Sequence, residues 1–340
     1  MKKIVLLYTG GTIGMTMNKE TGFLEPHSLE SLLEKVPQMG KFKAQIDFYS
    51  FPKIKDSADI SLEDWQSIGS YIWEHYTLYD GFVILHGTDT MSYTASALSF
   101  MFQNLDKPIL VTGAAYPIEN TISDAVNNLL FALKVCLLCR KDAVNPLLTE
   151  VGIVFNNKVF RANRTVKLNS TGFDLYTSPN FPVLLSLETL TNFDVNLFLR
   201  PNLNRPVRFL PKLSNQCLVL NLFPGITKEF VVQYLNALPF KVLIVGAYGS
   251  GTIISAPWFT DCLKNVISHD KHVVMYSQCV FGKIEPIYFS SKIWQDIGVI
   301  SVKDMTFEAL WVKVLFILGQ SEDNDYFKKN ISVSLCGEIT

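Results

Sequence analysis

The chain has 340 residues, of which 48% are hydrophobic and 18% charged, and its formal net charge is −1. This apolar content is ample for a buried core and excludes a disordered chain, which combines low hydrophobicity with high net charge. The near-neutral charge argues against nucleic acid as the main partner, because phosphate binding needs a clustered cationic surface. The length favours two domains over one.

The N-terminus, MKKIVLLY, contains an apolar run that is too short for a signal peptide and leads into a Thr-Gly-Gly turn. No stretch approaches the roughly 18 to 20 apolar residues of a membrane span. The longest candidate, 129–138, is interrupted by Lys134. We therefore expect a cytoplasmic protein with no membrane association.

The six cysteines are too few for a disulfide framework in a chain of this length. Cys136 and Cys139 have CxxC spacing, but they lie late in an apolar helical run, which favours a core-facing pair over a redox site. The five histidines show no metal-binding spacing. We expect neither a metal nor another cofactor.

Short β-branched apolar runs alternate with helical patterns along the first half of the chain. The predicted strands are 4–8, 82–85, 109–112 and 151–155, and the predicted helices are 62–75, 91–102 and 124–139. Near-continuous apolar strands between helices predict a parallel sheet that is covered on both faces.

Residues 186–213 are polar, contain three prolines and show no sustained period, so they are predicted to form a linker. The alternation then resumes, with strands at 217–222, 242–246 and 272–277 and helices at 227–237, 258–268 and 307–318. The predicted fold class is α/β with two α/β domains. The larger N-terminal domain, 1–185, is Rossmann-like with a mainly parallel sheet, and the smaller C-terminal domain, 214–340, also has a parallel sheet.

Three loops follow predicted strands of the first domain, where ligands of open α/β sheets bind. The first loop, 9–14, reads TGGTIG. It fails the GxGxxG fingerprint because Thr9 stands at the first glycine, and it fails the P-loop because no Gly-Lys-Ser/Thr follows. It is either a plain tight turn or a site in which Thr12 offers a nucleophilic hydroxyl beside backbone N–H groups.

The second loop, 86–90, reads HGTDT. Asp89 either caps the following helix or joins Thr88 as a functional group that binds a substrate ammonium or orients a lysine. We interpret His86 as structural, and the absence of a Gly-x-Ser-x-Gly elbow argues against a Ser/His/Asp triad.

The third loop, 155–167, carries four cations in ten residues. It is either a solvated surface stretch or the source of a desolvated lysine near Asp89 that accepts a proton.

Together these loops resemble the bacterial-type asparaginase/glutaminase family, and most closely its cytoplasmic type I L-asparaginases. The first signature is YTGGTIG at 8–14, and the second is DGFVILHGTDTM at 80–91. Two signatures in this order are far more specific than either alone. Similarity extends over nearly the whole chain, including 92–100, 107–113, 163–167 and 277–283, and weakens between about 185 and 214.

The resemblance implies hydrolysis of L-asparagine to L-aspartate and ammonia through a threonine nucleophile. The nucleophile falls on Thr12, and the Thr-Lys-Asp relay falls on Thr88, Lys167 and Asp89. Further family positions concern substrate binding. Ser57, within Asp56-Ser-Ala-Asp59, is placed at the α-carboxylate and Asp89 at the α-ammonium, while Gly11, Gly87 and Ala114 supply backbone contacts.

Some positions depart from the family pattern. Relatives usually carry a tyrosine after a glycine in the mobile lid, here 15–27, but Phe23 follows Gly22, so the ring remains and the phenol hydroxyl is lost. Ala58 replaces a residue that is often polar, 123–125 reads SDA instead of SDG, and many relatives carry asparagine near Thr252. These changes concern turnover and selectivity more than reaction class.

The resemblance also implies self-association as a homodimer or dimer of dimers, in which the second domain of a neighbour closes the pocket. Residues 248–252, with Thr252, are the candidate contribution of that neighbour. The expected partners are a small-molecule amino acid and further copies of the chain. Type I relatives can bind amino acid at a second, regulatory pocket, for which the stretch around Cys279 is the candidate.

The sequence is also compatible with two alternative functions. The protein is alternatively a glutaminase or a mixed asparaginase–glutaminase, because pockets discriminate one methylene by only about 1–3 kcal/mol. An alternative from a different class is a weakly active amino-acid sensor. Phe23 supports this alternative, because it lacks the phenol hydroxyl that relatives carry in the lid. The intact Thr12, Thr88, Asp89 and Lys167 argue against a sensor, since a binder needs no proton relay. A nucleotide-dependent oxidoreductase is disfavoured by the failed fingerprint.

Overall fold

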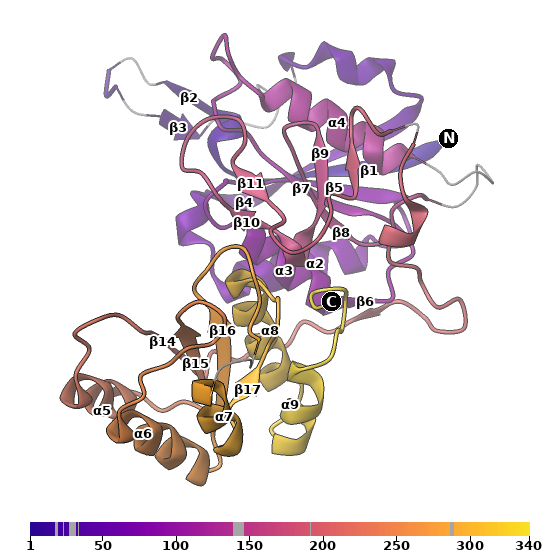
Figure 1. The fold of residues 1–340 in the computed structure, drawn as a ribbon. Helices are drawn as coiled ribbons and strands as arrows, with labels where there is room; N and C mark the ends of the chain where they lie inside the picture. Colours follow the sequence, from indigo (N-terminus) through magenta and orange to yellow (C-terminus); the bar gives the residue numbers. More distant parts are fainter. Residues whose placement is uncertain are drawn as a thin grey trace. The chain divides into compact units, whose positions relative to one another are not determined.

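The structure is a computed structural model that describes residues 1–17, 20–22, 24–26, 32, 34–138, 146–190, 192–285 and 289–340. The chain divides into two compact units, Met1–Pro211 and Lys212–Thr340 (Figure 1). Each unit has its own parallel sheet, so the predicted α/β class with a larger N-terminal and a smaller C-terminal part is confirmed.

The strands of the first unit are β1 (Lys2–Gly10), β2 (Met15–Met17), β3 (Leu24–Pro26), β4 (Ala44–Lys55), β5 (Gly81–Leu85), β6 (Phe102–Gln103), β7 (Ile109–Thr112), β8 (Val151–Phe155), β9 (Lys158–Arg161), β10 (Val166–Lys167), β11 (Tyr176–Thr177), β12 (Leu185–Ser186) and β13 (Arg208–Phe209). Its α-helices are α2 (Leu62–Glu74), α3 (Met91–Met101) and α4 (Ala125–Leu137). Its 3₁₀ turns are η1 (Thr12–Gly14), η2 (Pro37–Lys41), η3 (Ser57–Asp59), η4 (Ala162–Arg164) and η5 (Val195–Leu197).

The main sheet has the strand order β12-β9-β8-β7-β5-β1-β4 among the described residues. The five strands β4, β1, β5, β7 and β8 are parallel to one another, whereas β9 runs antiparallel to both β8 and β12. Tyr8 pairs with Leu85, and Leu85 pairs with Thr112, so the carboxyl ends of β1, β5 and β7 lie level. The loops after these strands therefore leave the sheet side by side.

The order of the strands changes direction at β1. From β1 the chain continues to β4 on one side, and it then returns to β5 on the other side of β1. Such a switch point opens a crevice beyond the carboxyl ends of the two diverging strands, and this is where ligands bind in open α/β sheets. Topology alone thus points to the loops that follow β1 and β5.

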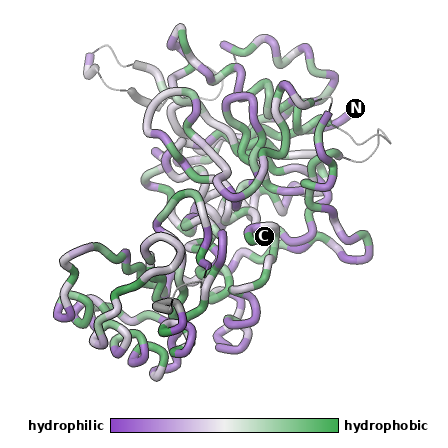
Figure 2. Tube along the Cα trace, viewed as in Figure 1, coloured by the Kyte–Doolittle hydropathy of each residue, from purple (hydrophilic) through white to green (hydrophobic). Residues whose placement is uncertain are grey.

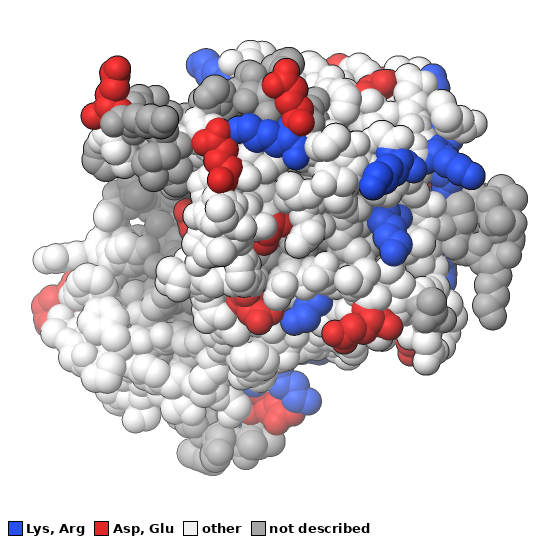
Figure 3. Space-filling model, turned by 90° about the horizontal axis from the view of Figure 1, so that it is seen from above, with Lys and Arg blue, Asp and Glu red and all other residues white. Residues whose placement is uncertain are grey.

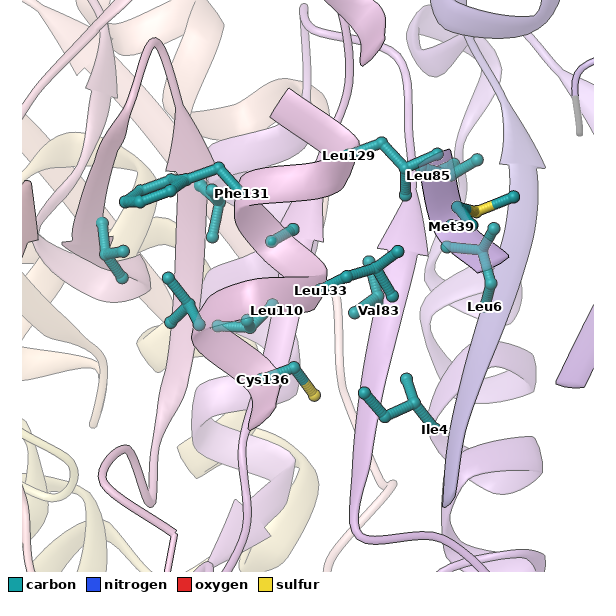
Figure 4. Packing of buried hydrophobic residues seen from close by; sticks show 14 of the residues in the cluster. Ile4, Leu6, Met39, Val83, Leu85, Leu110, Leu129, Phe131, Leu133 and Cys136 are labelled. Atoms are coloured by element: carbon teal, nitrogen blue, oxygen red, sulfur yellow. The ribbon is translucent and has the colours of Figure 1, made fainter. Parts of the chain in front are cut away.

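Helices cover both faces of this sheet. Figure 1 shows α4 on one face and α2 and α3 on the other. In Figure 4, Leu129, Leu133 and Cys136 from α4 face strand side chains that include Val83 and Leu85. Cys136 is buried, which confirms its predicted core position and raises the pKa of its thiol to about 12, whereas Cys139 lies outside the described residues. The central strands are correspondingly apolar (Figure 2).

The twelve-residue strand β4 was not predicted from the sequence. It pairs only with β1 among the described strands, so it is an edge strand, and each of its residues is either partly buried or exposed. It also contains Pro52, which interior strands exclude but edge strands tolerate. These properties hide an edge strand from a search for continuous apolar runs.

The segment predicted as a linker, 186–213, packs almost entirely with the first unit, whose boundary falls after Pro211. The buried Arg161–Glu150 ion pair, with 2.6 Å between Nε and Oε2, holds it there. Arg161 also donates to the Leu197 carbonyl at 2.6 Å, and the Leu199 N–H donates to Glu150 at 2.9 Å. A polar, proline-rich stretch without periodicity is therefore ordered here by long-range ionic hydrogen bonds.

The second unit contains β14 (Cys217–Asn221), α5 (Lys228–Ala237), β15 (Val242–Ala247), α6 (Pro257–Ser268), β16 (His272–Ser277), α7 (Phe289–Asp296), β17 (Ile300–Ser301), α8 (Phe307–Gln320) and α9 (Asn324–Ile331). Its sheet has the order β14-β15-β16-β17 and is parallel throughout its described strands. The short polar helix α9 was not predicted, because its apolar anchors are only Phe327, stacked on His272, and Ile331.

A buried ion pair fixes the C-terminal end of the chain. Lys313 and Glu338 are both fully buried and lie 2.6 Å apart. Lys313 also donates to the carbonyls of Ile331 and Val333, and Glu338 accepts from the Cys336 N–H. All three ammonium hydrogens of Lys313 thus have acceptors, which is the condition for burying such a charge.

No α-helix of the described chain is long and apolar enough to cross a membrane. Figure 3 shows that basic and acidic side chains both occur on the face it displays, in several places side by side.

We predict that Glu338→Ala lowers the free energy of unfolding of the second unit by about 3–5 kcal/mol, because it leaves the Lys313 charge buried and uncompensated. Asp261→Ala is the control, since the Asp261–Lys264 pair is 3.8 Å apart and largely exposed, and its loss costs at most about 1 kcal/mol. Urea unfolding followed by tryptophan fluorescence measures both. Equal losses in the two variants would contradict the role assigned to the buried pair.

Candidate active site

The first signature loop is shaped by two adjacent glycines. Gly10 and Gly11 have φ angles of 123° and 89°, which L side chains rarely adopt. A Cβ atom on Gly10 would lie 2.2 Å from the Lys55 carbonyl oxygen, and one on Gly11 would lie 2.3 Å from the Gly87 nitrogen. The loop therefore requires glycine at both positions, and its backbone lies directly against the second signature loop.

A second close approach continues this row of contacts. A Cβ atom on Gly87 would lie 2.6 Å from the Ser57 hydroxyl oxygen. Ser57 is buried in η3, directly after β4. Three predicted substrate-binding positions, Gly11, Gly87 and Ser57, are thus brought together from the ends of three different strands. Thr12 and Thr88 each follow one of the glycines by one residue, and both are half-buried.

Lys167 connects the two functional groups of the second signature. Its ammonium lies 2.9 Å from the Thr88 hydroxyl oxygen and 2.6 Å from Oδ1 of Asp89. The Lys167 side chain is only 19% exposed, whereas that of Asp89 is 65% exposed. Asp89 is thereby anchored on one side and open to a ligand on the other.

The alternative that Asp89 caps a helix is not realised. The N-cap of α3 is Thr90, and it makes no side-chain capping bond. The Thr90 hydroxyl instead donates to the Ser57 carbonyl at 2.6 Å, and the Asp89 N–H donates to the Ser57 hydroxyl oxygen at 3.2 Å. The second loop is therefore tied to η3, and the Ser57 hydroxyl hydrogen stays available for a ligand.

The cation-rich stretch is largely buried, so its interpretation as a solvated surface is wrong. Arg161, Arg164 and Lys167 are buried or nearly so, and only Lys158 is substantially exposed. Arg161 pairs with Glu150, and the guanidinium of Arg164 lies 5.3 Å from the centre of the Phe181 ring. Two of the cations thus support the fold, and Lys167 reaches the site.

Sequence reasoning missed Tyr176, which also reaches the second loop. Lys167 and Tyr176 are direct partners in the antiparallel β10–β11 pair. The Tyr176 hydroxyl donates to the Thr88 carbonyl, and the side chain is buried against Phe155. No local motif marks this tyrosine, because its role depends on a contact between residues 88 positions apart.

His86 is a structural histidine within a hydrogen-bond chain, as predicted. Its Nδ1 lies 2.7 Å from the Gly87 carbonyl oxygen, and its Nε2 lies 2.9 Å from the Thr94 hydroxyl. Thr94 accepts from Nε1 of Trp65 at 2.9 Å. Because a carbonyl can only accept and an indole N–H can only donate, Nδ1 carries the proton and Nε2 accepts. Burial lowers the pKa of His86 to about 4, so the ring is neutral.

The loop after β7 carries the predicted backbone contact at Ala114, and buried polar side chains of α4 and its N-cap hold this loop by hydrogen bonds. The buried Asp124 accepts from the N–H groups of Ala115, at 2.9 Å, and Tyr116, at 3.2 Å. Asn128 donates to the Gly113 carbonyl and accepts from the Asn156 N–H. Ala114 is therefore flanked by hydrogen-bonded neighbours that fix its backbone. Sequence reasoning noted Asp124 only as part of a departure from the family pattern.

Three further predicted positions are not among these site residues of the first unit. Phe23 is outside the described residues, although 15–17 and 24–26 pair as β2 and β3. Thr252 is exposed in the second unit, in a tight turn closed by its bridge to Tyr248. Cys279 is exposed, and its N–H donates to Ser277, which in turn donates to the Gly249 carbonyl. The candidate neighbour contact and the candidate regulatory stretch therefore adjoin each other.

The assembled groups suit chemistry on a small zwitterion with an electrophilic carbonyl. Asp89 offers a carboxylate to an ammonium, and Ser57 offers a buried hydroxyl to a carboxylate. Thr12 and Thr88 each follow one of the two glycines whose backbones lie against each other, and the Thr88 hydroxyl accepts a hydrogen bond from an ammonium. Among the described residues, no group of His, Cys, Asp and Glu side chains has metal-binding geometry.

Comparison with known proteins gives the same class over both units. The family model described as asparaginase, N-terminal, matches residues 3–199, and the glutaminase/asparaginase C-terminal domain model matches residues 216–330. The chain therefore belongs to the asparaginase family, as its two signatures predicted.

Individual relatives match along their whole length. L-asparaginase 1 of Escherichia coli K12 is 37% identical, in an alignment that covers 100% of this chain and 98% of that protein. The structure of L-asparaginase I from Vibrio cholerae superposes with a TM-score of 0.87 at 34% identity, covering 100% of this chain and 99% of the other. The thermostable L-asparaginase from Thermococcus kodakarensis gives 0.88 at 29% identity, covering 99% of each chain.

We predict that Gly11→Ala destabilises the first unit beyond the cost of its φ angle, because the new methyl group meets the Gly87 backbone. Gly225→Ala is the matched control, since Gly225 has a φ of 90° but open space around its Cβ position. We expect the loss at Gly11 to exceed the loss at Gly225 by about 1–3 kcal/mol. Denaturant titration measures the free energy of unfolding of the unit that carries each substitution. Similar losses in the two variants would contradict a backbone contact that requires glycine at position 11.

The buried His86 predicts a pH dependence of stability. Its pKa in the folded state, about 4, lies below the unfolded value of 6.5, so the unfolded state binds the additional proton as the pH falls. The stabilisation is complete above pH 6.5 and is lost towards pH 4, by roughly 2 kcal/mol between pH 6.5 and 5. Urea unfolding of the wild-type protein and His86→Asn across this window tests it. The variant should lose this slope, and equal slopes would contradict a neutral, buried ring.

Proposed function

We propose that the protein hydrolyses L-asparagine to L-aspartate and ammonia. The observation that carries this proposal is the contact of one lysine ammonium with both Thr88 and Asp89, beside the backbone contact that brings the Thr12 loop alongside. The relatives named as L-asparaginases support the same substrate.

Substrate binding uses the two charges of the amino acid. The exposed Asp89 carboxylate binds the α-ammonium, and the Ser57 hydroxyl donates a hydrogen bond to the α-carboxylate. The Asp89 N–H donates to the Ser57 hydroxyl oxygen, so this hydrogen bond restrains the distance between the two residues that bind the substrate charges. Fixing both charges directs the side-chain amide towards the two threonines, and this orientation removes part of the entropic barrier.

The chemical step starts at Thr12. Its hydroxyl oxygen forms a bond to the amide carbonyl carbon, and backbone N–H groups stabilise the oxyanion. The hydroxyl proton passes through Thr88 to the amide nitrogen, the C–N bond breaks, and ammonia leaves. Water then cleaves the ester, restoring the Thr12 hydroxyl and releasing L-aspartate. In a direct variant, water attacks the amide itself.

Lys167 makes Thr88 a competent proton carrier. A threonine hydroxyl is scarcely ionised at neutral pH, so an unaided relay is slow. The Lys167 ammonium donates to the Thr88 oxygen and stabilises negative charge that develops on it during proton transfer. Asp89 holds the other side of the ammonium at 2.6 Å and keeps it in place.

Several finer assignments belong to the same proposal. Phe23 serves as the aromatic residue of the lid, Gly11, Gly87 and Ala114 supply backbone contacts, and Thr252 contributes from a neighbouring copy. A homodimer or dimer of dimers and a cytoplasmic location follow from the resemblance to type I enzymes. Glutaminase or mixed activity is the second candidate, because the binding groups for the α-substituents are common to asparagine and glutamine.

The experiment is ammonia release by the purified protein, with L-asparagine and L-glutamine titrated separately. We expect strong preference for asparagine. Preference for glutamine would move the assignment to a glutaminase. Binding of either amino acid by calorimetry without release would instead identify a sensor.

Substitutions then test the assigned groups. We expect Thr12→Ala and Thr88→Val each to lower kcat by at least about a hundredfold, since each removes a group that transfers a proton or forms a bond. Thr177→Val, on the β10–β11 hairpin, is the control and should keep kcat within about twofold. Near-wild-type turnover by both site variants would refute the threonine assignment.

A further inference from the structure

We propose that Tyr176 is a positioning residue for the reaction, acting through its hydroxyl on the main chain of Thr88. This inference rests on the proposed function, because it assigns Tyr176 to the same relay. Tyr176 meets neither substrate nor reacting atoms in this role.

The contact is specific to one atom of the second loop. The Tyr176 hydroxyl donates to the Thr88 carbonyl oxygen, and only 5% of the residue is exposed. Phe155 packs edge-on against the Tyr176 ring, with 5.1 Å between the two ring centroids, and this packing restricts the orientation of the phenol. The hydroxyl therefore has a defined acceptor and little freedom to choose another.

The Thr88–Asp89 peptide is held at both of its polar groups. The Tyr176 hydroxyl donates to the carbonyl oxygen, and the N–H of the peptide donates to the Ser57 hydroxyl oxygen at 3.2 Å. This peptide joins the threonine of the relay to the aspartate that binds the ammonium. Rotation of its plane would displace the Thr88 side chain from Lys167, and the two hydrogen bonds oppose that rotation.

Lys167 and Tyr176 approach Thr88 from the same hairpin. They are cross-strand partners, so the hairpin delivers an ammonium to the Thr88 side chain and a hydroxyl to its main chain. Burial, with a contribution from the Asp89 charge, raises the pKa of Tyr176 well above its usual value. The hydroxyl consequently stays protonated and remains a donor throughout the working pH range.

The test is Tyr176→Phe, which removes the hydroxyl and keeps the ring. The control is Tyr76→Phe, because Tyr76 is similarly buried in the same unit and its hydroxyl donates to Asp106 at 2.7 Å, outside the site. We expect Tyr176→Phe to lower kcat for asparagine about five- to tenfold with KM changed by less than about twofold. Tyr76→Phe should leave kcat unchanged, although both variants lose a buried hydrogen bond and melt at lower temperature.

A double variant separates positioning from a general structural defect. If Tyr176 acts through Thr88, adding Tyr176→Phe to Thr88→Val lowers the residual kcat by less than about twofold. A variant that merely contained less active protein would lose the full five- to tenfold in both backgrounds. A multiplicative loss, or a Tyr176→Phe single variant with wild-type kcat, would overturn the assignment.

Failure of the proposed function looks different. A wild-type protein that releases no ammonia from asparagine or glutamine contradicts the proposed function itself. Wild-type turnover retained by Thr88→Val contradicts the relay and, with it, the role of Tyr176. An active wild type, an impaired Thr88→Val and an unaffected Tyr176→Phe would reject Tyr176 alone.

Discussion

The backbone contact between Gly11 and Gly87 is the constraint on which the site depends. The two glycines leave no space for a side chain between the loops, and Gly87 in turn lies against Ser57. The spacing between Thr12 and Thr88 is therefore set by main-chain atoms, which are far less adjustable than side chains. The two loops follow the adjacent parallel strands β1 and β5, so the spacing of these strands determines how the two loops are placed.

Buried polar groups behind the loops complete this arrangement. His86 binds the Gly87 carbonyl, Asp124 binds the N–H groups beside Ala114, and Tyr176 binds the Thr88 carbonyl. All three side chains are buried, so these hydrogen bonds hold the loops from within the protein. Because an unsatisfied buried polar group costs about 1–3 kcal/mol, these bonds are strong local restraints even though their net contribution to stability is modest.

The sequence predicted the parts of the molecule that have short-range patterns. Apolar strands such as β7 and β8 and the two glycine-containing signatures are local, and Thr88, Asp89 and Lys167 followed from family motifs. The edge strand β4 and the packing of the described part of 186–211 with the first unit were not predicted, because pairing on one side and long-range ionic hydrogen bonds leave no period in the sequence. Tyr176 was missed for the same reason, since its acceptor is distant in the chain.

The hairpin that carries Lys167 and Tyr176 has a consequence for how such a site can change over evolutionary time. Its two strands pair over only two residues each, and the turn between them, 168–175, includes Gly172 at a φ of 84° with open space around it. Both attachments to Thr88 move with this one short element. Inherited changes in the length or composition of the turn can therefore adjust turnover gradually, while every group that meets the substrate stays the same.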